Sequence, residues 1–317
     1  ERQLEDLFVC RFPSLASDVE ERKRFVRSLT QDKSIEELGQ WIYYPWRKTL
    51  VHLLNREDFV EVRTNRNKQK ISHAEQQTLS NKTIGIIGLS VGHSIAISIA
   101  MERGCGKFRL ADFDTVDLSN LNRLRTGVFN LGMPKVILAA REIAEIDPYI
   151  EVEVFLNGFN AENEDEFLIG SNKLDLLIEV CDNFSVKVQS RLRAREFGIP
   201  VIMETNDRGM LDIERFDLNQ DQEIFHGLAG ELTMEKIENL DAASKMALLM
   251  KIVNASELSD RMKSSLPEIG KSLKSWPQLA SEVVLGGAVV AWASRKLLLD
   301  LNMANGRYYV DLEKIIS

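Results

Sequence analysis

This sequence has few cysteines, no long apolar run and no excess of basic residues. The three cysteines, Cys10, Cys105 and Cys181, are widely separated and form no CxxC pair. This argues against a disulfide framework and a structural zinc module, and favours reduced thiols in a cytoplasmic protein. The longest apolar stretch, residues 283–293, is too short to span a bilayer, and no signal-peptide pattern opens the chain. A net charge of −8 argues against a general surface for nucleic acid or anionic membranes.

The rest of the composition is that of an ordinary globular protein. The chain has 317 residues, of which 44% are hydrophobic and 28% are charged. This is enough for a sizeable core in one large or two modest domains. The chain starts at Glu1 rather than Met, which leaves room for a piece of a longer protein.

Apolar periodicity divides the chain into three segments. Residues 1–80 are predicted to be a mainly helical accessory segment that contains the aromatic stretch "WIYYPW" (41–46). In residues 81–215 strand and helix patterns alternate, with strands expected over 82–89, 107–114, 150–155, 174–183 and 199–206 and helices over 94–104, 134–147 and 185–198. This alternation predicts an α/β fold: a Rossmann-like, doubly wound and mainly parallel sheet.

The last segment, residues 216–317, breaks this rhythm. A helical insertion is expected up to residue 280, followed by an apolar helix over 281–300 that the pair Gly286–Gly287 interrupts. A closing strand is expected over 306–312. Within the middle segment, Gly104 is predicted to close the helix over 94–104, and Pro134 to occupy the first position of the helix over 134–147.

A glycine turn follows the first strand of the middle segment. It reads "GLSVGHS" (88–94), so Gly88, Ser90 and Gly92 are candidates for binding a phosphate at a helix start, where backbone N–H groups form an anion site. Asp112 follows Gly92 by about 20 residues, where an acid holds a ribose hydroxyl in nucleotide-binding folds. The pattern predicts nucleotide binding without choosing between NAD and ATP. We interpret His93 as a polar residue of the first helical turn rather than a phosphate contact.

The stretch "LADFDTVDLSNLNR" (110–123) narrows this choice. Its pattern D-x-D-x-V-x-x-S-N-L-x-R resembles the E1-like adenylyltransferases, the family of ubiquitin-activating enzymes and of the bacterial ThiF and MoeB proteins. "GMPK" (132–135) and "EVCDN" (179–183) follow in the family's order, and "VLGGAVVAWASRKLLL" (284–299) is similar to its late packing helix. The resemblance covers residues 63–215 well and 281–312 loosely.

The resemblance implies roles for particular side chains. Asp112 would hold the ribose of ATP, with Asp114 and Asn183 as near neighbours. Cations and polar groups around the phosphates would be Asn120, Arg123, Lys135 and, before the first strand, Arg66. Asp182 would bind Mg²⁺, and Arg123 would imply a homodimer. Asp182 and Asn183 also suit a second reading, as caps of the helix that begins near Ser185.

The resemblance implies ATP-dependent activation of a carboxylate as an acyl-adenylate. No cysteine follows Cys181, and Cys181 is expected to be a buried structural thiol, so no thioester step is expected. The acceptor stays open between a ubiquitin-like protein, a sulfur-carrier protein and a small-molecule carboxylate. Two other readings remain: an NAD- or FAD-binding Rossmann protein, and a non-catalytic E1-like scaffold within a longer chain.

Overall fold

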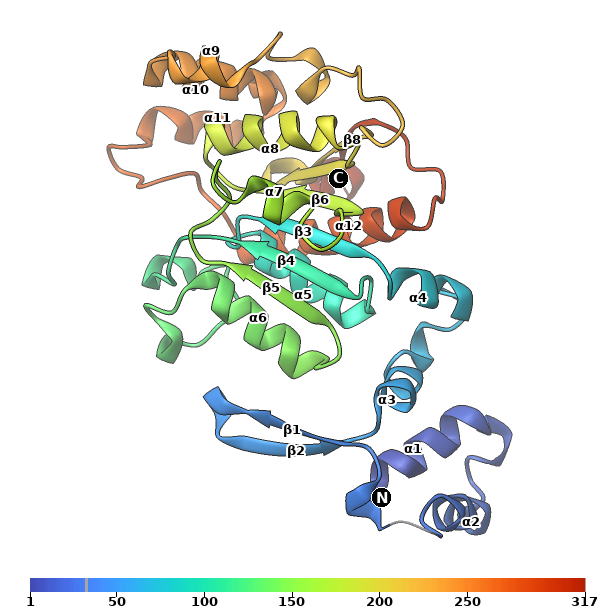
Figure 1. Ribbon diagram of the computed structural model, residues 1–317. Helices are drawn as coiled ribbons and strands as arrows, with labels where there is room; N and C mark the ends of the chain where they lie inside the picture. Colours follow the sequence, from blue (N-terminus) through green and yellow to red (C-terminus); the bar gives the residue numbers. More distant parts are fainter. Residues whose placement is uncertain (32–33, 317) are drawn as a thin grey trace. The chain divides into compact units, whose positions relative to one another are not determined.

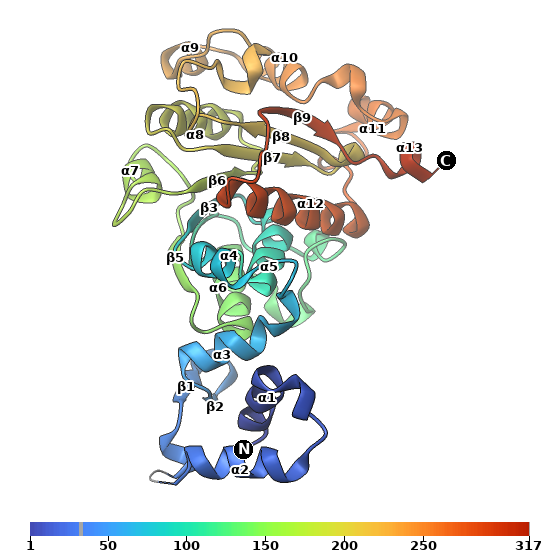
Figure 2. The same cartoon turned by 90° about the vertical axis from the view of Figure 1, so that its right-hand side faces the viewer.

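The computed structural model describes residues 1–31 and 34–316, and it divides into one unit over residues 1–76 and a second over residues 77–317. Figures 1 and 2 together label the helices and strands of both. The first unit contains α1 (Arg2–Arg11), α2 (Val19–Leu29), β1 (Gln40–Tyr44), β2 (Thr49–Leu53) and α3 (Arg56–Arg63); α4 (His73–Leu79) spans the division. Its small core joins Leu4, Val26 and Leu54.

The aromatic stretch of the first unit forms a hairpin rather than part of a helical layer. β1 and β2 pair antiparallel, with Tyr44 opposite Thr49 across a tight turn. The ring of Trp41 stacks on that of His52, with centroids 4.4 Å apart. Aromatic residues that meet across strands in this way stabilise a hairpin. Helical periodicity did not reveal the hairpin, because this stabilising contact joins two strands rather than neighbours along one helix.

A seven-stranded sheet forms the centre of the second unit. Its strands are β3 (Thr83–Ile87), β4 (Lys107–Ala111), β5 (Glu151–Phe155), β6 (Leu176–Glu179), β7 (Val201–Thr205), β8 (Met210–Glu214) and β9 (Gly306–Tyr309). The spatial order is β5-β4-β3-β6-β7-β8-β9. The first five strands in this order are parallel, β8 runs antiparallel to β7, and β9 runs antiparallel to β8 and so in the direction of the first five. This confirms the Rossmann-like, mainly parallel sheet expected from the alternation of patterns.

Helices cover both faces of this sheet (Figure 2). One face carries α5 (Gly92–Glu102), α6 (Lys135–Ile146) and α12 (Ala280–Leu298); the other carries α7 (Glu164–Leu168) and α8 (Phe184–Glu196). The insertion adds α9 (Met234–Glu238), α10 (Ala242–Ile252) and α11 (Asp260–Ser265), and α13 (Leu312–Ile316) follows β9. β3 and β6 are buried along their whole length because they are covered on both faces.

The two glycines of α12 do not interrupt the helix, contrary to the expectation from sequence. α12 is continuous through Gly286 and Gly287. A Cβ on Gly287 would lie 2.5 Å from Ser94 Oγ and 3.1 Å from the Ser94 carbonyl carbon, and one on Gly286 would lie 2.3 Å from Glu204 Oε1. The glycines therefore allow close approach of α5 and of a buried side chain.

Two helix ends also differ by one residue from the expectation. The left-handed residue that closes α5 is Arg103, at φ +54°, rather than Gly104. Its buried guanidinium pairs with Asp147, and this pairing compensates for the unfavourable backbone conformation. Pro134 is the N-cap of α6, and Lys135 is its first helical residue.

Candidate functional site

The residues singled out from sequence gather at the carboxyl ends of β3, β4 and β6, the three adjacent strands at the centre of the sheet. The chain leaves β3 toward β4 on one side, whereas β6 lies on the other side. In doubly wound sheets such a point of reversal opens the crevice in which ligands bind.

The glycine turn after β3 is shaped by close contacts with the segment after β6. Gly88 has φ +89°, and a Cβ there would lie 2.9 Å from the backbone nitrogen of Cys181. Gly92 begins α5, where a Cβ would lie 2.9 Å from Ile86 Cγ2. Both glycines are thus required by packing, and the backbone can approach a ligand closely between them.

Asp112 joins the glycine turn to the acid-rich loop. Its buried carboxylate accepts hydrogen bonds from the backbone N–H of Leu89 at 2.5 Å and of Asp114 at 2.7 Å. Burial raises the pKa of Asp112, whereas the two N–H donors act in the opposite direction. Asp112 therefore holds the glycine turn and the acid-rich loop together at the end of β4. Its contact with a ribose stays a prediction from sequence.

Lys135 lies against the same loop. Its buried ammonium is 2.8 Å from Asp114 Oδ2, and its backbone N–H donates to the Asp114 carbonyl at 2.9 Å. The cation therefore sits at the start of α6, where the helix dipole disfavours it. Asp114 is half exposed, so an incoming anion can compete with it for the lysine.

Arg123 approaches the glycine turn from the other side. Its Nε donates to Ser90 Oγ at 3.1 Å, and its Nη1 donates to Asn122 Oδ1 at 2.8 Å. Partial burial lowers the pKa of Arg123, and the charge of Asp182 opposes this effect. Asn120 holds the preceding turn: its Oδ1 accepts from the Asp117 N–H at 2.9 Å in a capping box.

Asp182 and Asn183 take different roles after β6. Asn183 caps α8 by accepting from the Val186 N–H at 3.1 Å, so for this residue the structure shows the helix-cap reading. Asp182 is exposed and lines a cavity. Cys181 is half-buried and lines the same cavity, and burial and Glu179 raise the pKa of its thiol well above the ordinary value. The expectation of a structural thiol agrees with this environment.

These contacts form one connected set. Asp182 acts on Arg123, Arg123 donates to Ser90, the glycine turn donates to Asp112, and Asp112 is linked through Asp114 to Lys135. Arg66 belongs to the first unit, in the short 3₁₀ helix Asn65–Asn67. Its assignment to the phosphates stays a prediction.

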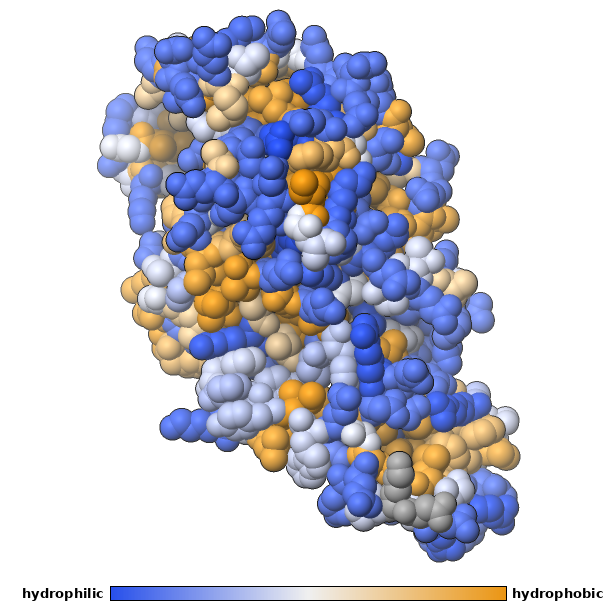
Figure 3. Space-filling view, in the orientation of Figure 1, coloured by the Kyte–Doolittle hydropathy of each residue, from blue (hydrophilic) through white to orange (hydrophobic). Residues whose placement is uncertain are grey.

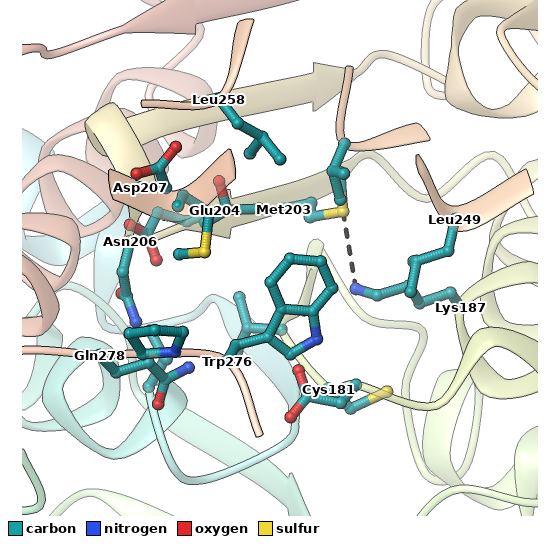
Figure 4. A pocket seen from close by; sticks show the side chains of 17 residues that line it. Cys181, Lys187, Met203, Glu204, Asn206, Asp207, Leu249, Leu258, Trp276 and Gln278 are labelled. Carbon is teal, nitrogen blue, oxygen red and sulfur yellow. Dashed lines mark hydrogen bonds between the residues drawn. The ribbon is translucent and has the colours of Figure 1, made fainter. Parts of the chain in front are cut away.

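A cavity of about 110 Å³ adjoins the set on the β6–β7 side. Its walls come from the segment after β6, the end of β7, the insertion and the segment that precedes α12 (Figure 4). Asn122 fixes that last segment by donating to the Gln278 carbonyl at 2.8 Å. In Figure 4, Glu204, Asn206 and Asp207 lie on one side, Lys187 and Leu249 on the other, and Trp276 between them.

A buried network of charges behind the cavity was missed from sequence. Lys187 lies 3.1 Å from Glu179, and Arg191 bridges Glu179 at 2.6 Å and Glu214 at 2.5 Å. Burial alone would raise the pKa of Glu179, but Lys187 and Arg191 hold it below its ordinary value. Two acids in buried strands and two cations four residues apart on α8 were the available signals.

Comparison with known proteins identifies the family of this chain. The model of the ThiF family matches residues 63–274, two thirds of the sequence. The chain belongs to the ThiF family. The E1-like resemblance of the acid-rich stretch is thereby confirmed.

Individual relatives agree with this assignment. The chain is 43% identical over 283 residues to the uncharacterized protein MT1398 of Mycobacterium tuberculosis (strain CDC 1551 / Oshkosh), covering 89% of this chain but 39% of that protein. Among solved structures, the Escherichia coli tRNA N6-threonylcarbamoyladenosine dehydratase TcdA in complex with AMP superposes with a TM-score of 0.52 at 17% identity, over 75% of this chain and 95% of that one. E. coli MccB with ATP gives 0.51 at 13% identity, over 95% and 80%.

The described residues contain neither a membrane-spanning helix nor a ready-made metal cluster. No helix among residues 1–31 and 34–316 is long and apolar enough to cross a membrane. Over the same residues, no cluster of three or more His, Cys, Asp or Glu side chains has the geometry to hold a metal ion.

Proposed function

We propose that this protein is an ATP-dependent adenylyltransferase that activates a carboxylate as an acyl-adenylate. The observation that carries the proposal is the connected set of Arg123, Ser90, Asp112, Asp114 and Lys135 at the carboxyl edge of the sheet, next to the exposed Asp182. The set combines a helix start, two cations and a free carboxylate at one crevice. Membership of the ThiF family, and the AMP and ATP bound by two proteins of the same fold, support it.

The chemistry needs positioning and charge neutralisation rather than an enzyme nucleophile. A substrate carboxylate oxygen forms a bond to the α-phosphorus of ATP, and the bond to the leaving pyrophosphate breaks. Negative charge grows on the pyrophosphate, where Arg123 and Lys135 would stabilise it. Binding of the phosphates would draw Lys135 away from Asp114, to which it is paired at 2.8 Å. Asn120 would keep Arg123 in place through the turn that it caps.

Asp182 fits the role of a Mg²⁺ ligand. Mg²⁺ is commonly held by one or two carboxylates together with the substrate phosphates, so a larger cluster of protein ligands is not required. Asp182 is exposed at the crevice and is not used in the cap of α8. The ion, when bound, would supply positive charge to the phosphate oxygens.

No thioester step is proposed. Burial raises the pKa of Cys105 and of Cys181, which keeps both thiols protonated and unreactive. The acceptor of the adenylyl group is then a substrate carboxylate. The acyl-adenylate that forms either leaves the enzyme or transfers its acyl group to a second nucleophile, releasing AMP. A ubiquitin-like protein, a sulfur-carrier protein and a small carboxylate are the candidate classes.

We further propose that the protein acts as a homodimer. Large apolar side chains are exposed around the acid-rich loop and the edge strand β5: Phe113, Leu118, Val128, Phe129 and Leu156. Figure 3 shows apolar side chains gathered on the face over the end of β5 and the neighbouring coil. Exposed apolar patches of this kind mark association surfaces, and this one adjoins Arg123.

Calorimetric titration with ATP and Mg²⁺ tests the adenylation proposal. We expect micromolar ATP binding that weakens about tenfold or more in both Lys135→Ala and Asp182→Ala. Lys135→Ala removes a cation from the phosphates, and Asp182→Ala removes the carboxylate that would hold Mg²⁺. Lys173→Ala is the matched control, because Lys173 is exposed next to a different pocket that contains none of these residues. NAD⁺ is the control ligand. Tighter binding of NAD⁺ would favour a Rossmann redox protein, and binding of neither nucleotide would favour a scaffold.

A further inference from the structure

The cavity beside Asp182 contains acceptors without donors. Among the residues that line it, four buried side-chain atoms make no hydrogen bond: the two carboxyl oxygens of Glu204, Asn206 Oδ1 and Gln278 Oε1. All four are oxygens. An amide can turn to present its nitrogen, but a carboxyl group cannot, so Glu204 carries the argument. Buried polar atoms without partners are rare in folded proteins and each needs an explanation.

The surroundings of Glu204 keep its carboxyl group buried and without a hydrogen-bond partner. It ends the buried part of β7, its side chain is 4% exposed, and its carboxyl group lies against the backbone of α12 at Gly286. Lys187, the lysine that lines the cavity, lies on α8 at the other face of the sheet and binds both oxygens of Glu179 at 3.1 Å. Burial raises the pKa of Glu204 to about 8, and the charge of Glu282 adds to the effect.

The other ionisable groups around Glu204 are mainly acidic. Glu282 on α12 raises the pKa of Glu204, Asp207 follows β7 by two residues, and Asp182 also lines the cavity. Like charges at short range favour a cation in their midst. The remaining walls include Leu249, Met262 and Trp276, which suit a chain of methylene groups next to an aromatic ring.

We propose that this cavity binds a protonated primary amine carried by the substrate, with Glu204 as its counter-ion. An ammonium has three donors and one positive charge, which matches the three side chains that present unpaired oxygens. The identification as a substrate subsite rests on the adenylation proposed above; the binding of the amine does not. The substrate class is then a carboxylate that also carries an amine.

Binding of the amine is coupled to a proton. At pH 7 Glu204 is largely protonated in the free protein, whereas an ammonium pairs with its carboxylate. Binding therefore releases close to one proton per site at pH 7, and progressively less as the pH rises above 8.

Calorimetry with n-pentylammonium chloride tests the proposal, with n-pentanol as the neutral probe of equal length. Titrations at pH 7 in phosphate and in MOPS, two buffers without a primary amine and with different heats of ionisation, count the protons released. We expect n-pentylammonium to bind at least about tenfold more tightly than n-pentanol, with proton release. Glu204→Gln should abolish both the preference and the release. Asp221→Asn, an exposed acid elsewhere on the chain, removes the same charge and should change neither.

The outcomes separate this proposal from the proposed function. Equal binding of the two probes, no binding of the ammonium, or an ammonium preference that survives in Glu204→Gln would overturn the amine site. ATP binding is measured on the same samples. Unchanged ATP binding in Glu204→Gln shows that the variant is folded, whereas loss of ATP binding in the wild type would overturn the adenylation proposal and leave the amine result standing.

Discussion

At the residue scale, the ionisation of Glu204 makes stability depend on pH. Its pKa is about 8 in the folded protein, against an ordinary value of 4.5. Between these values the folded protein holds a proton that the unfolded chain has lost, so stability falls as the pH rises from about 4.5 to 8 and this effect ends above 8.

The slope of this effect can be measured. We expect Glu204→Gln to lose less unfolding free energy than the wild type between pH 6 and pH 8, by at most about 1.4 kcal/mol per pH unit. Urea unfolding at several pH values measures it. Parallel curves for the two proteins would show that Glu204 ionises normally in the folded state.

Arg191 provides a second prediction at this scale. The side chains of Arg191, Glu179 and Glu214 are almost completely buried. Arg191→Met leaves the two carboxylates short of a partner, and we expect a loss of about 3–5 kcal/mol in unfolding free energy. Arg193→Met on the same helix is the control, because its ion pairs are at the surface, and it should cost about 1 kcal/mol or less. Similar losses in urea unfolding would argue against a buried network.

At the element scale, the packing of α12 on α5 decides how the glycine pair behaves. Helix propensity alone favours alanine over glycine by about 1 kcal/mol. The Cβ of Gly287→Ala would press on Ser94, including its backbone carbonyl. We therefore expect a net loss of about 1–3 kcal/mol from overpacking.

Ala288→Gly is the matched control in the same helix. Ala288 is exposed, so only propensity changes, and the expected cost is about 1 kcal/mol or less. Thermal or urea unfolding of both variants tests the contact. A Gly287→Ala variant more stable than the wild type would contradict the close approach of the two helices.

At the scale of the whole molecule, the exposed apolar residues near the acid-rich loop test the proposed homodimer. Phe129 is 78% exposed. We expect Phe129→Glu to shift the protein from dimer toward monomer, because a charge in an apolar interface must be desolvated. Sedimentation velocity measures the change. Leu218→Glu, at an equally exposed site far along the chain, should leave the dimer intact. A wild-type monomer at all concentrations would contradict the proposal.

Particular residues show how far sequence reasoning could reach. Asp112 was singled out by its spacing from Gly92, and Asp114 and Lys135 by the resemblance to the E1-like family; all three lie at one edge of the sheet. Three predictions were wrong in detail: that Gly104 closes α5, that Pro134 is the first residue of α6, and that two glycines break α12. Each position makes a tertiary contact that local preference does not include: the pair Arg103–Asp147, the bridge between Thr115 and Pro134, and the packing of α12 on Ser94 and Glu204.

The amino-acid sequence by itself determined the alternation of strands and helices, the parallel sheet that follows from it, and the edge at which the motif residues gather. These depend on periodicity and on turn chemistry over short stretches of chain. Only the tertiary structure decided which side chains meet. Lys187 and Arg191 reach Glu179 and Glu214, and Gln278 closes a cavity over Glu204, because sheet order and the return of α12 join segments far apart in sequence. No local pattern encodes such pairings, since each depends on burial that exists only once the sheet is covered on both faces.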